Sequence, residues 1–196
     1  RWRREVGQVV VSCPHRCDSF GSGGAAGLVW RPLSKPVVLA GADGQAKLLQ
    51  EEGVEHERAY LARLRKEGLT VAKISDQGSL STRVAATREA MRDGADVIYQ
   101  GALFNAPWHG FSDFLLRVNG IASQLGNYAY DVADTKLART AKPKHVIQLS
   151  VYADLLGVAQ GIEPPQMHVV LGDGTRVSLR TSDVRHYYCV ARERFA

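Results

Sequence analysis

The sequence predicts an α/β domain with a central mixed sheet, an antiparallel meander within that sheet, and flanking helices. The chain has 196 residues, of which 45% are hydrophobic and 23% charged, enough for one domain with a sizeable core. Segments with apolar residues at helical spacing alternate with strand-like runs, and three such runs follow one another directly. This order of elements is also compatible with an α+β arrangement.

The segment 1–45 is poorly defined and precedes the domain that we predict for residues 46–196. It contains "CDSFGSGGAAGLVWRPLSKP", which is rich in Gly, Ser and Pro and shows neither helical nor strand periodicity. The chain begins with Arg rather than Met and ends in what resembles an unfinished helix. We therefore expect it to be a fragment of a longer protein.

The first half of the predicted domain consists of a helix, a short strand and a second helix. Apolar residues at roughly helical spacing predict a helix over 46–68, with Gly68 as its stop. A short strand over 69–74 follows. Ser81 then precedes the second helix, which we predict over 82–94.

The second half begins with the meander and continues through a helix, a hairpin and a last helix. The three meander strands are predicted over 96–104, 111–118 and 127–137. The second and third are joined by a polar, Gly-containing connection around 119–127. Pro143 suits the first turn of a helix that continues to residue 158. The turn Gly172-Asp173-Gly174 between two alternating runs predicts a hairpin, and Ser182 opens the last helix.

Two aspartates in the meander are predicted to lie side by side. If the connection is symmetric, with residue 119 opposite 128, antiparallel pairing places Asp113 opposite Asp134, although a one-residue slip would separate them. Two opposed carboxylates repel, so one pKa should rise unless a cation lies between them. Lys136 shares the face of Asp134, whereas Thr135 points to the other face. We expect a Mg²⁺ site beside a lysine that handles a water; the alternative is a salt bridge at a solvated strand end.

Composition narrows the classes of function. The net charge of +5 is compatible with phosphate-backbone binding but does not demand it. No apolar run approaches the ~20 residues needed to span a bilayer, and the start lacks the features of a signal peptide, so we expect no membrane association. The three cysteines are too few for a disulfide framework and favour a reducing, cytoplasmic location.

Four short motifs lie in order along the domain: "GVEHE" (53–57), "GFSD" (110–113), "DTK" (134–136) and "QLSVY" (148–152). Their order and approximate spacing resemble those of the RecB-like nucleases of the PD-(D/E)XK superfamily. The chain is most similar to the stand-alone members of that family and to its CRISPR-associated exonucleases, over residues 46–195. The resemblance implies a restriction-endonuclease-like core and a metal-dependent deoxyribonuclease.

The resemblance also implies a role for each residue of the central motifs. His56, Asp113 and Asp134 would bind Mg²⁺ or Mn²⁺, with the Thr135 backbone carbonyl completing the site. Lys136 would be the catalytic lysine, which positions or deprotonates the attacking water. For His56, a place on the surface or in the core is the alternative.

Residues around this centre receive supporting roles. Gln148 and Tyr152 share one face of a helix at i and i+4 and would support the ligands or touch DNA, although Tyr152 also suits the core. Glu57 points about 100° away from His56 on a helix, so we interpret it as a solvated charge or a group behind the ligands. Three further polar residues are candidates for DNA contact, with plain surface positions as the alternative for the lysines: Gln100, Lys142 and Lys144.

The expected function is hydrolysis of DNA phosphodiester bonds in repair, recombination or defence, with single strands or DNA ends as substrate and a fused or associated helicase domain as partner. The alternatives are a catalytically lapsed nucleic-acid-binding module of a larger helicase–nuclease protein and a hydrolase of another phosphodiester. Several RecB-like nucleases hold an iron–sulphur cluster through one cysteine before the core and three after it. Here Cys13 and Cys17 precede the core and Cys189 is isolated, so only missing sequence could complete such a cluster.

Overall fold

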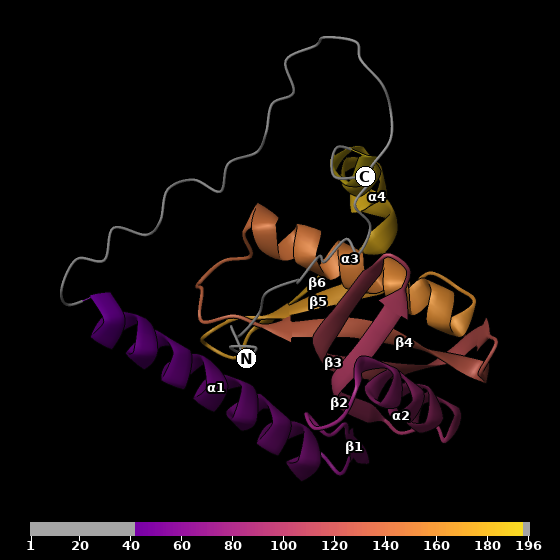
Figure 1. The fold of residues 1–196 in the computed structure, drawn as a ribbon, viewed down its shortest axis with the longest axis horizontal. Coiled ribbons are helices and arrows are strands. Elements are labelled where there is room, and N and C mark those ends of the chain that lie inside the picture. The colour runs from indigo at the N-terminus through magenta and orange to yellow at the C-terminus, as the bar shows by residue number, and fades with distance from the viewer. Residues whose placement is uncertain (1–41, 194–196) are drawn as a thin grey trace, which may run out of the picture.

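The computed structural model describes residues 42–193, in which four helices pack around one six-stranded mixed sheet (Figure 1). The strands are β1 (Val71–Lys73), β2 (Val97–Asn105), β3 (Trp108–Ser123), β4 (Gly126–Thr135), β5 (Gln166–Val170) and β6 (Arg176–Arg180). The helices are α1 (Ala42–Lys66), α2 (Leu80–Arg92), α3 (Pro143–Gln160) and α4 (Thr181–Glu193). The predicted α/β domain with a mixed sheet flanked by helices is confirmed.

The helix α1 begins at Ala42, earlier than the start that we predicted at residue 46. Cys13 and Cys17 lie outside the described residues, while Cys189 is a free cysteine on α4. None of the described helices is both long and apolar enough to cross a membrane.

The strands stand in the sheet in the order in which they occur in the chain. The pairs β1–β2 and β4–β5 are parallel, and the other neighbours are antiparallel, so β2, β3 and β4 form the predicted meander. The register of β3 and β4 pairs Val118 with Ala129 and Phe114 with Ala133. This is the predicted register.

The predicted loop over 119–127 is wrong. β3 continues to Ser123 and β4 begins at Gly126, so the two strands form a long ribbon with a tight end. The pairing shifts register between Asn119 and Ser123, where Gly120 has a φ of +79°. The polar residues that suggested a loop lie in this irregular part of the strand. A bulge of this kind lets a strand continue through residues that break its regular pairing.

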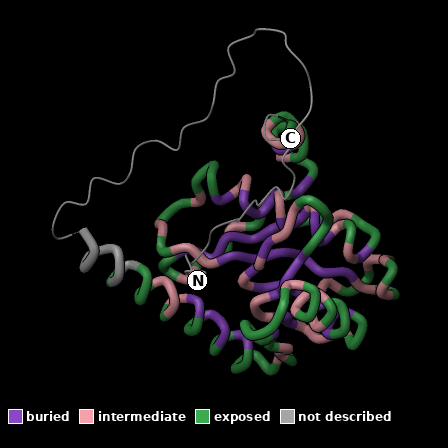
Figure 2. Tube along the Cα trace, in the orientation of Figure 1, coloured by how far each residue is buried: buried purple, intermediate pink, exposed green. Residues whose placement is uncertain are grey.

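Each face of the sheet is covered by helices, and Figure 2 shows the buried residues running along the strands between them. On one face, α1 packs Tyr60, Leu61 and Leu64 against residues such as Phe114 and Ala133. On the other face, α2 and α3 share a larger core; it includes Met91, Leu115, Val132, Leu149 and Leu156. The ends of β3 and β4 that carry the two aspartates therefore lie between α1 and α3.

Two helix starts test the capping signals. Ser79, rather than Ser81, caps α2, because the Ser79 hydroxyl oxygen accepts a hydrogen bond from the Thr82 backbone N–H at 3.1 Å. The helix α3 begins at Pro143, as predicted, and ends at Gly161, whose φ of +76° suits glycine. The position of α3 fixes where Gln148 and Tyr152 lie relative to the meander.

Candidate active site

Asp113 and Asp134 lie next to each other beyond the last paired residues of β3 and β4. The paired positions Phe114 and Ala133 precede them directly in the ladder. The closeness of the two carboxylates is also evident electrostatically, because the charge of Asp113 raises the pKa of Asp134. The predicted juxtaposition is therefore present in the structure.

Asp134 is the most deeply buried charge of the site, with 1% of its surface exposed. Burial raises the pKa of its carboxyl group well above the usual value, and the neighbouring Asp113 raises it further. Lys136 Nζ forms an ion pair with Oδ2, which leaves Oδ1 as the buried oxygen without an ion-pair or hydrogen-bond partner among the described residues. An ionised carboxylate with an unsatisfied buried oxygen is costly unless something binds it.

Asp113 is held in place by the strand beside it. Its Oδ2 accepts hydrogen bonds from the Thr135 backbone N–H at 2.9 Å and from the Thr135 hydroxyl at 3.0 Å. Lys136 follows the end of β4, and its backbone N–H donates to the Val170 carbonyl of β5 at 2.8 Å. Thr135 and Lys136 thus fix the geometry of the two aspartates through the backbone.

Glu57 belongs to the same group of charges, and its interpretation as a solvated charge is wrong. It is only 5% exposed, and the Gln100 side-chain amide donates a hydrogen bond to its Oε1. Burial and the Asp113 charge raise its pKa from 4.5 to about 7, against the opposing effects of Tyr99, Gln100 and Lys136. Glu57 therefore lies on the sheet-facing side of α1.

These raised pKa values predict that the metal-free protein becomes less stable as the pH rises. Between pH 4.5 and 7 the unfolded chain releases the Glu57 proton while the folded protein keeps it, which costs at most about 3 kcal/mol by pH 7. Asp134 acts in the same direction. Thermal unfolding in EDTA between pH 5 and 8 should show a falling melting temperature, and Glu57→Gln should flatten that slope. An equal slope in both proteins would contradict the placement of Glu57.

Gln148 and Tyr152 bring α3 over the aspartates. Both side chains are buried, and Gln148 Nε2 donates to the Tyr152 hydroxyl at 3.2 Å. Burial and the Asp134 charge raise the pKa of Tyr152, so the phenol stays protonated. Its ring lies directly on Gly110 of the "GFSD" motif, where a Cβ atom would come within 2.5 Å of Tyr152 Cε1. Gly110 is therefore needed for the close approach of α3 to β3.

Gly110→Ala is expected to destabilise the protein by about 1–3 kcal/mol, because the Tyr152 ring is buried and has little room to move. Gly53→Ala is the matched control, since its Cβ would meet only Leu137 Cδ1 at 4.0 Å and alanine favours the helix interior. Urea unfolding of the three proteins measures both effects. A Gly110→Ala variant as stable as the wild type would show that Tyr152 is not held as described.

His56 contacts the backbone of β5. Its Nε2 lies 3.4 Å from the Val170 backbone carbonyl, at the end of that strand. Within the range 42–193, no three His, Cys, Asp or Glu side chains form a group that could hold a metal ion. The structure thus brings Asp113 and Asp134 together but does not add His56 to them as a third ligand.

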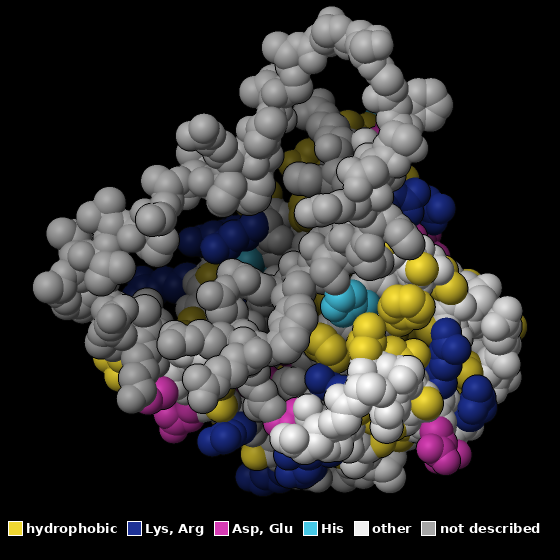
Figure 3. All heavy atoms as spheres, viewed as in Figure 1, with side chains coloured by type: hydrophobic (Ala, Val, Ile, Leu, Met, Phe, Trp, Pro, Cys, Tyr) yellow, Lys and Arg dark blue, Asp and Glu magenta, His cyan; other side chains and the backbone are white. Residues whose placement is uncertain are grey.

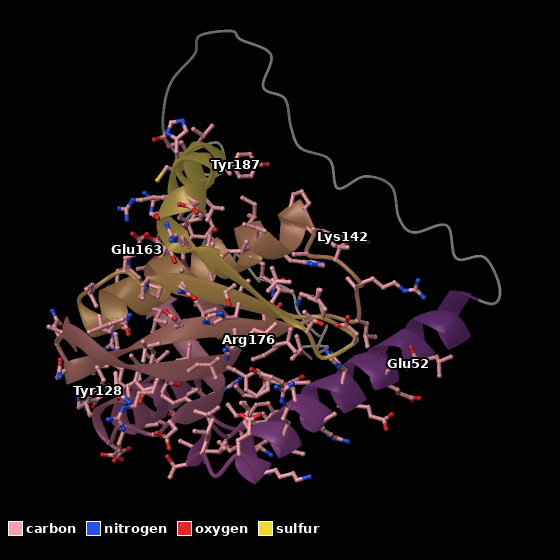
Figure 4. All side chains as sticks on the ribbon, turned by 180° about the vertical axis from the view of Figure 1, so that it is seen from behind. Glu52, Tyr128, Lys142, Glu163, Arg176 and Tyr187 are labelled. Carbon is pink, nitrogen blue, oxygen red and sulfur yellow. The ribbon has the colours of Figure 1, made fainter. Side chains whose placement is uncertain are left out.

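Basic residues gather where the chain leaves β4 and enters α3. The pKa of His145 is lowered by burial and by the charges of Lys136, Lys144 and Lys142. The Lys142 backbone N–H donates to His145 Nδ1 at 3.2 Å. Figure 4 shows Lys142 at the start of α3, the end of this helix that lies nearer to α1. Figure 3 shows Lys and Arg side chains in this region and at the end of α1.

The donor set suits a hard divalent cation such as Mg²⁺ or Mn²⁺. Asp134 and the adjacent Asp113 offer carboxylate oxygens, and Mg²⁺ commonly takes one or two carboxylates and completes its shell with waters. The residues present therefore fit such an ion, with Asp113 and Asp134 as the groups that would hold it.

Comparison with known proteins adds no assignment. No protein-family model matches the chain, and no curated protein matches it.

Proposed function

We propose that this chain is a metal-dependent deoxyribonuclease that hydrolyses phosphodiester bonds. The observation that carries the proposal is the buried Asp134 side chain, which lies beside Asp113 and pairs with Lys136 through Oδ2. A pair of carboxylates with a lysine is the minimum that a nuclease site needs to hold a cation and to manage a water. The resemblance to RecB-like nucleases supports the same reading of these three residues.

Each residue has a chemical task in this proposal. A Mg²⁺ or Mn²⁺ ion, when bound by Asp113 and Asp134, would supply positive charge to the scissile phosphate and acidify a water. Lys136 reaches Asp134, so its ammonium group is placed to orient the attacking water and to stabilise developing negative charge; as a neutral amine, the same group would accept the proton of the water. Thr135 keeps the Asp113 carboxylate in one orientation through two hydrogen bonds. Attack on the backbone phosphate would be in line.

The flanking DNA would lie along the basic region at the start of α3. Lys142 and Lys144 are exposed there, and their charges, with that of Lys136, lower the pKa of His145. Their charges suit backbone phosphates and would make binding weaken as salt increases. We further propose that the substrate is single-stranded DNA or DNA ends and that the core is restriction-endonuclease-like. The protein would act in repair, recombination or defence in the cytoplasm, together with an associated helicase domain.

A catalytically lapsed nucleic-acid-binding module is the second candidate. The observation that favours it is the ion pair of Lys136 with Asp134, because Lys136 already neutralises this carboxylate without a metal ion. In such a module the basic region would bind DNA, and the acidic residues would have only a structural role.

Cleavage of end-labelled single- and double-stranded DNA in Mg²⁺, Mn²⁺ or EDTA tests the proposal. We expect cutting with either metal and none in EDTA. Salt-sensitive DNA binding without cutting would favour the binding module. Cutting of a small phosphodiester, with neither cutting nor binding of DNA, would point to another phosphodiesterase and contradict the DNA substrate.

A further inference from the structure

Gln100 occupies an unusual backbone conformation in the middle of β2. Its φ is +62°, a value that residues other than glycine rarely adopt and that strains the backbone. The residues on either side are regularly paired, Tyr99 with Phe114 and Gly101 with Ser112. Continuing this register places Gln100 opposite Asp113. The irregular backbone position in β2 therefore lies beside the candidate active site.

The strained backbone directs the Gln100 side chain to α1. Its amide Nε2 donates a hydrogen bond to Glu57 Oε1, which holds the Glu57 carboxylate between α1 and the sheet. Glu57 is buried and interacts electrostatically with both Asp113 and Lys136. His56, its neighbour in the sequence, instead reaches the Val170 carbonyl.

Three acidic side chains, Glu57, Asp113 and Asp134, meet at this place. Among the described residues, Lys136 is the cation that acts on both Glu57 and Asp134, and it forms an ion pair with Asp134 Oδ2. Asp134 Oδ1 is buried and has no such partner. The Asp113 charge opposes the ionisation of Glu57 and Asp134, and a bound divalent cation would relieve that repulsion.

We propose that Gln100 positions Glu57 as the third carboxylate of a divalent-cation site, so that α1 acts on the cation through Glu57 rather than through His56. The inference rests on the proposed function, in which Asp113 and Asp134 hold the ion. Glu57 does not form a closed ligand group with the two aspartates, so it acts on the cation through one of the ion's waters. Gln100 is a positioning residue: the amide keeps Glu57 turned inward.

Calorimetric titration of the full chain with Mn²⁺ tests this inference directly. Loss of a group behind the ligands typically weakens metal binding about 10–100-fold. We expect this loss for Glu57→Gln and for Gln100→Gly, and less than about twofold for His56→Gln. Glu55→Gln removes the same charge from an exposed position on α1 and serves as the control.

Unfolding in EDTA separates positioning from a structural role. Glycine adopts the φ of residue 100 without strain, so Gln100→Gly should be at least as stable as the wild type while its Mn²⁺ affinity falls. Wild-type Mn²⁺ affinity in both Glu57→Gln and Gln100→Gly, or a loss confined to His56→Gln, would overturn the inference.

The Mn²⁺ titration and the DNA cleavage assay test the inference and the nuclease proposal separately. Mn²⁺ binding that depends on Glu57 and Gln100, in a protein that cuts no DNA, would support the inference and contradict the nuclease. DNA cleavage by a protein whose Mn²⁺ affinity does not depend on Glu57 would support the nuclease and contradict the inference.

Discussion

Lys136→Ala is expected to reduce metal-dependent DNA cleavage by about 10²–10⁴-fold, the range found when a positioned acid–base group is removed. The side chain is 17% exposed and reaches the buried Asp134, so no bulk water or neighbouring lysine replaces it in the same position. Initial cleavage rates on end-labelled DNA in Mg²⁺ and in Mn²⁺ measure the loss.

Lys144→Ala is the matched control, because Lys144 is an exposed lysine at the start of α3. It should retain the cleavage rate at low salt and lose only some DNA affinity. Lys136→Ala also leaves Asp134 without its ion pair, so Lys136→Gln, which keeps a polar group, should be assayed beside it with circular dichroism as the check of fold. Equal cleavage by wild type and both folded Lys136 variants would remove Lys136 from the mechanism.

Asp113→Asn is expected to abolish cleavage and at the same time to stabilise the metal-free protein. The Asp113 charge repels Glu57 and Asp134, and an asparagine oxygen can still accept the two hydrogen bonds from Thr135. Relief of this repulsion should stabilise the fold by about 1 kcal/mol, or about 2–4 °C in melting temperature for a domain of this size. Active sites commonly trade stability for function in this way.

Thermal unfolding with EDTA and with Mg²⁺ separates the two effects. The wild type should gain stability from Mg²⁺, because a ligand that binds only the folded state stabilises it, and Asp113→Asn should not. Asp173→Asn is a control of opposite sign, since hydrogen bonds from Thr175 lower the pKa of this exposed aspartate. An Asp113→Asn variant less stable than the wild type in EDTA, yet still stabilised by Mg²⁺, would contradict the acidic centre described here.

The part of the site that lies on neighbouring strands could be predicted from the sequence. Strand pairing is local and obeys a fixed sum of residue numbers, so the symmetric register was sufficient to place Asp113 beside Asp134. The extent of the strands was harder to predict. The residues around the bulge near Gly120 have the polar, Gly-containing composition of a loop, although they belong to the strand.

The contribution of α1 depends on long-range packing and was predicted less well. A helix does not reveal which sheet residues it will face, so the motif alone drew attention to His56. One signal was present: Glu57 stands at i−3, i−4 and i−7 from Tyr60, Leu61 and Leu64, which form the buried face of α1. The sequence suggested Gln100 as a candidate for DNA contact, but in the structure its side chain donates to Glu57, and its positive φ is visible only there.

The position of Mn²⁺ in a crystal of the full chain grown or soaked with this ion tests the central claim most directly. Anomalous diffraction at the manganese edge should show one site within coordination distance of the Asp113 and Asp134 carboxylates, with Glu57 facing the ion's waters. A Mn²⁺ ion bound elsewhere, or an Asp113–Asp134 pair that stays empty at millimolar Mn²⁺, would contradict the proposed cation centre and the nuclease mechanism built on it.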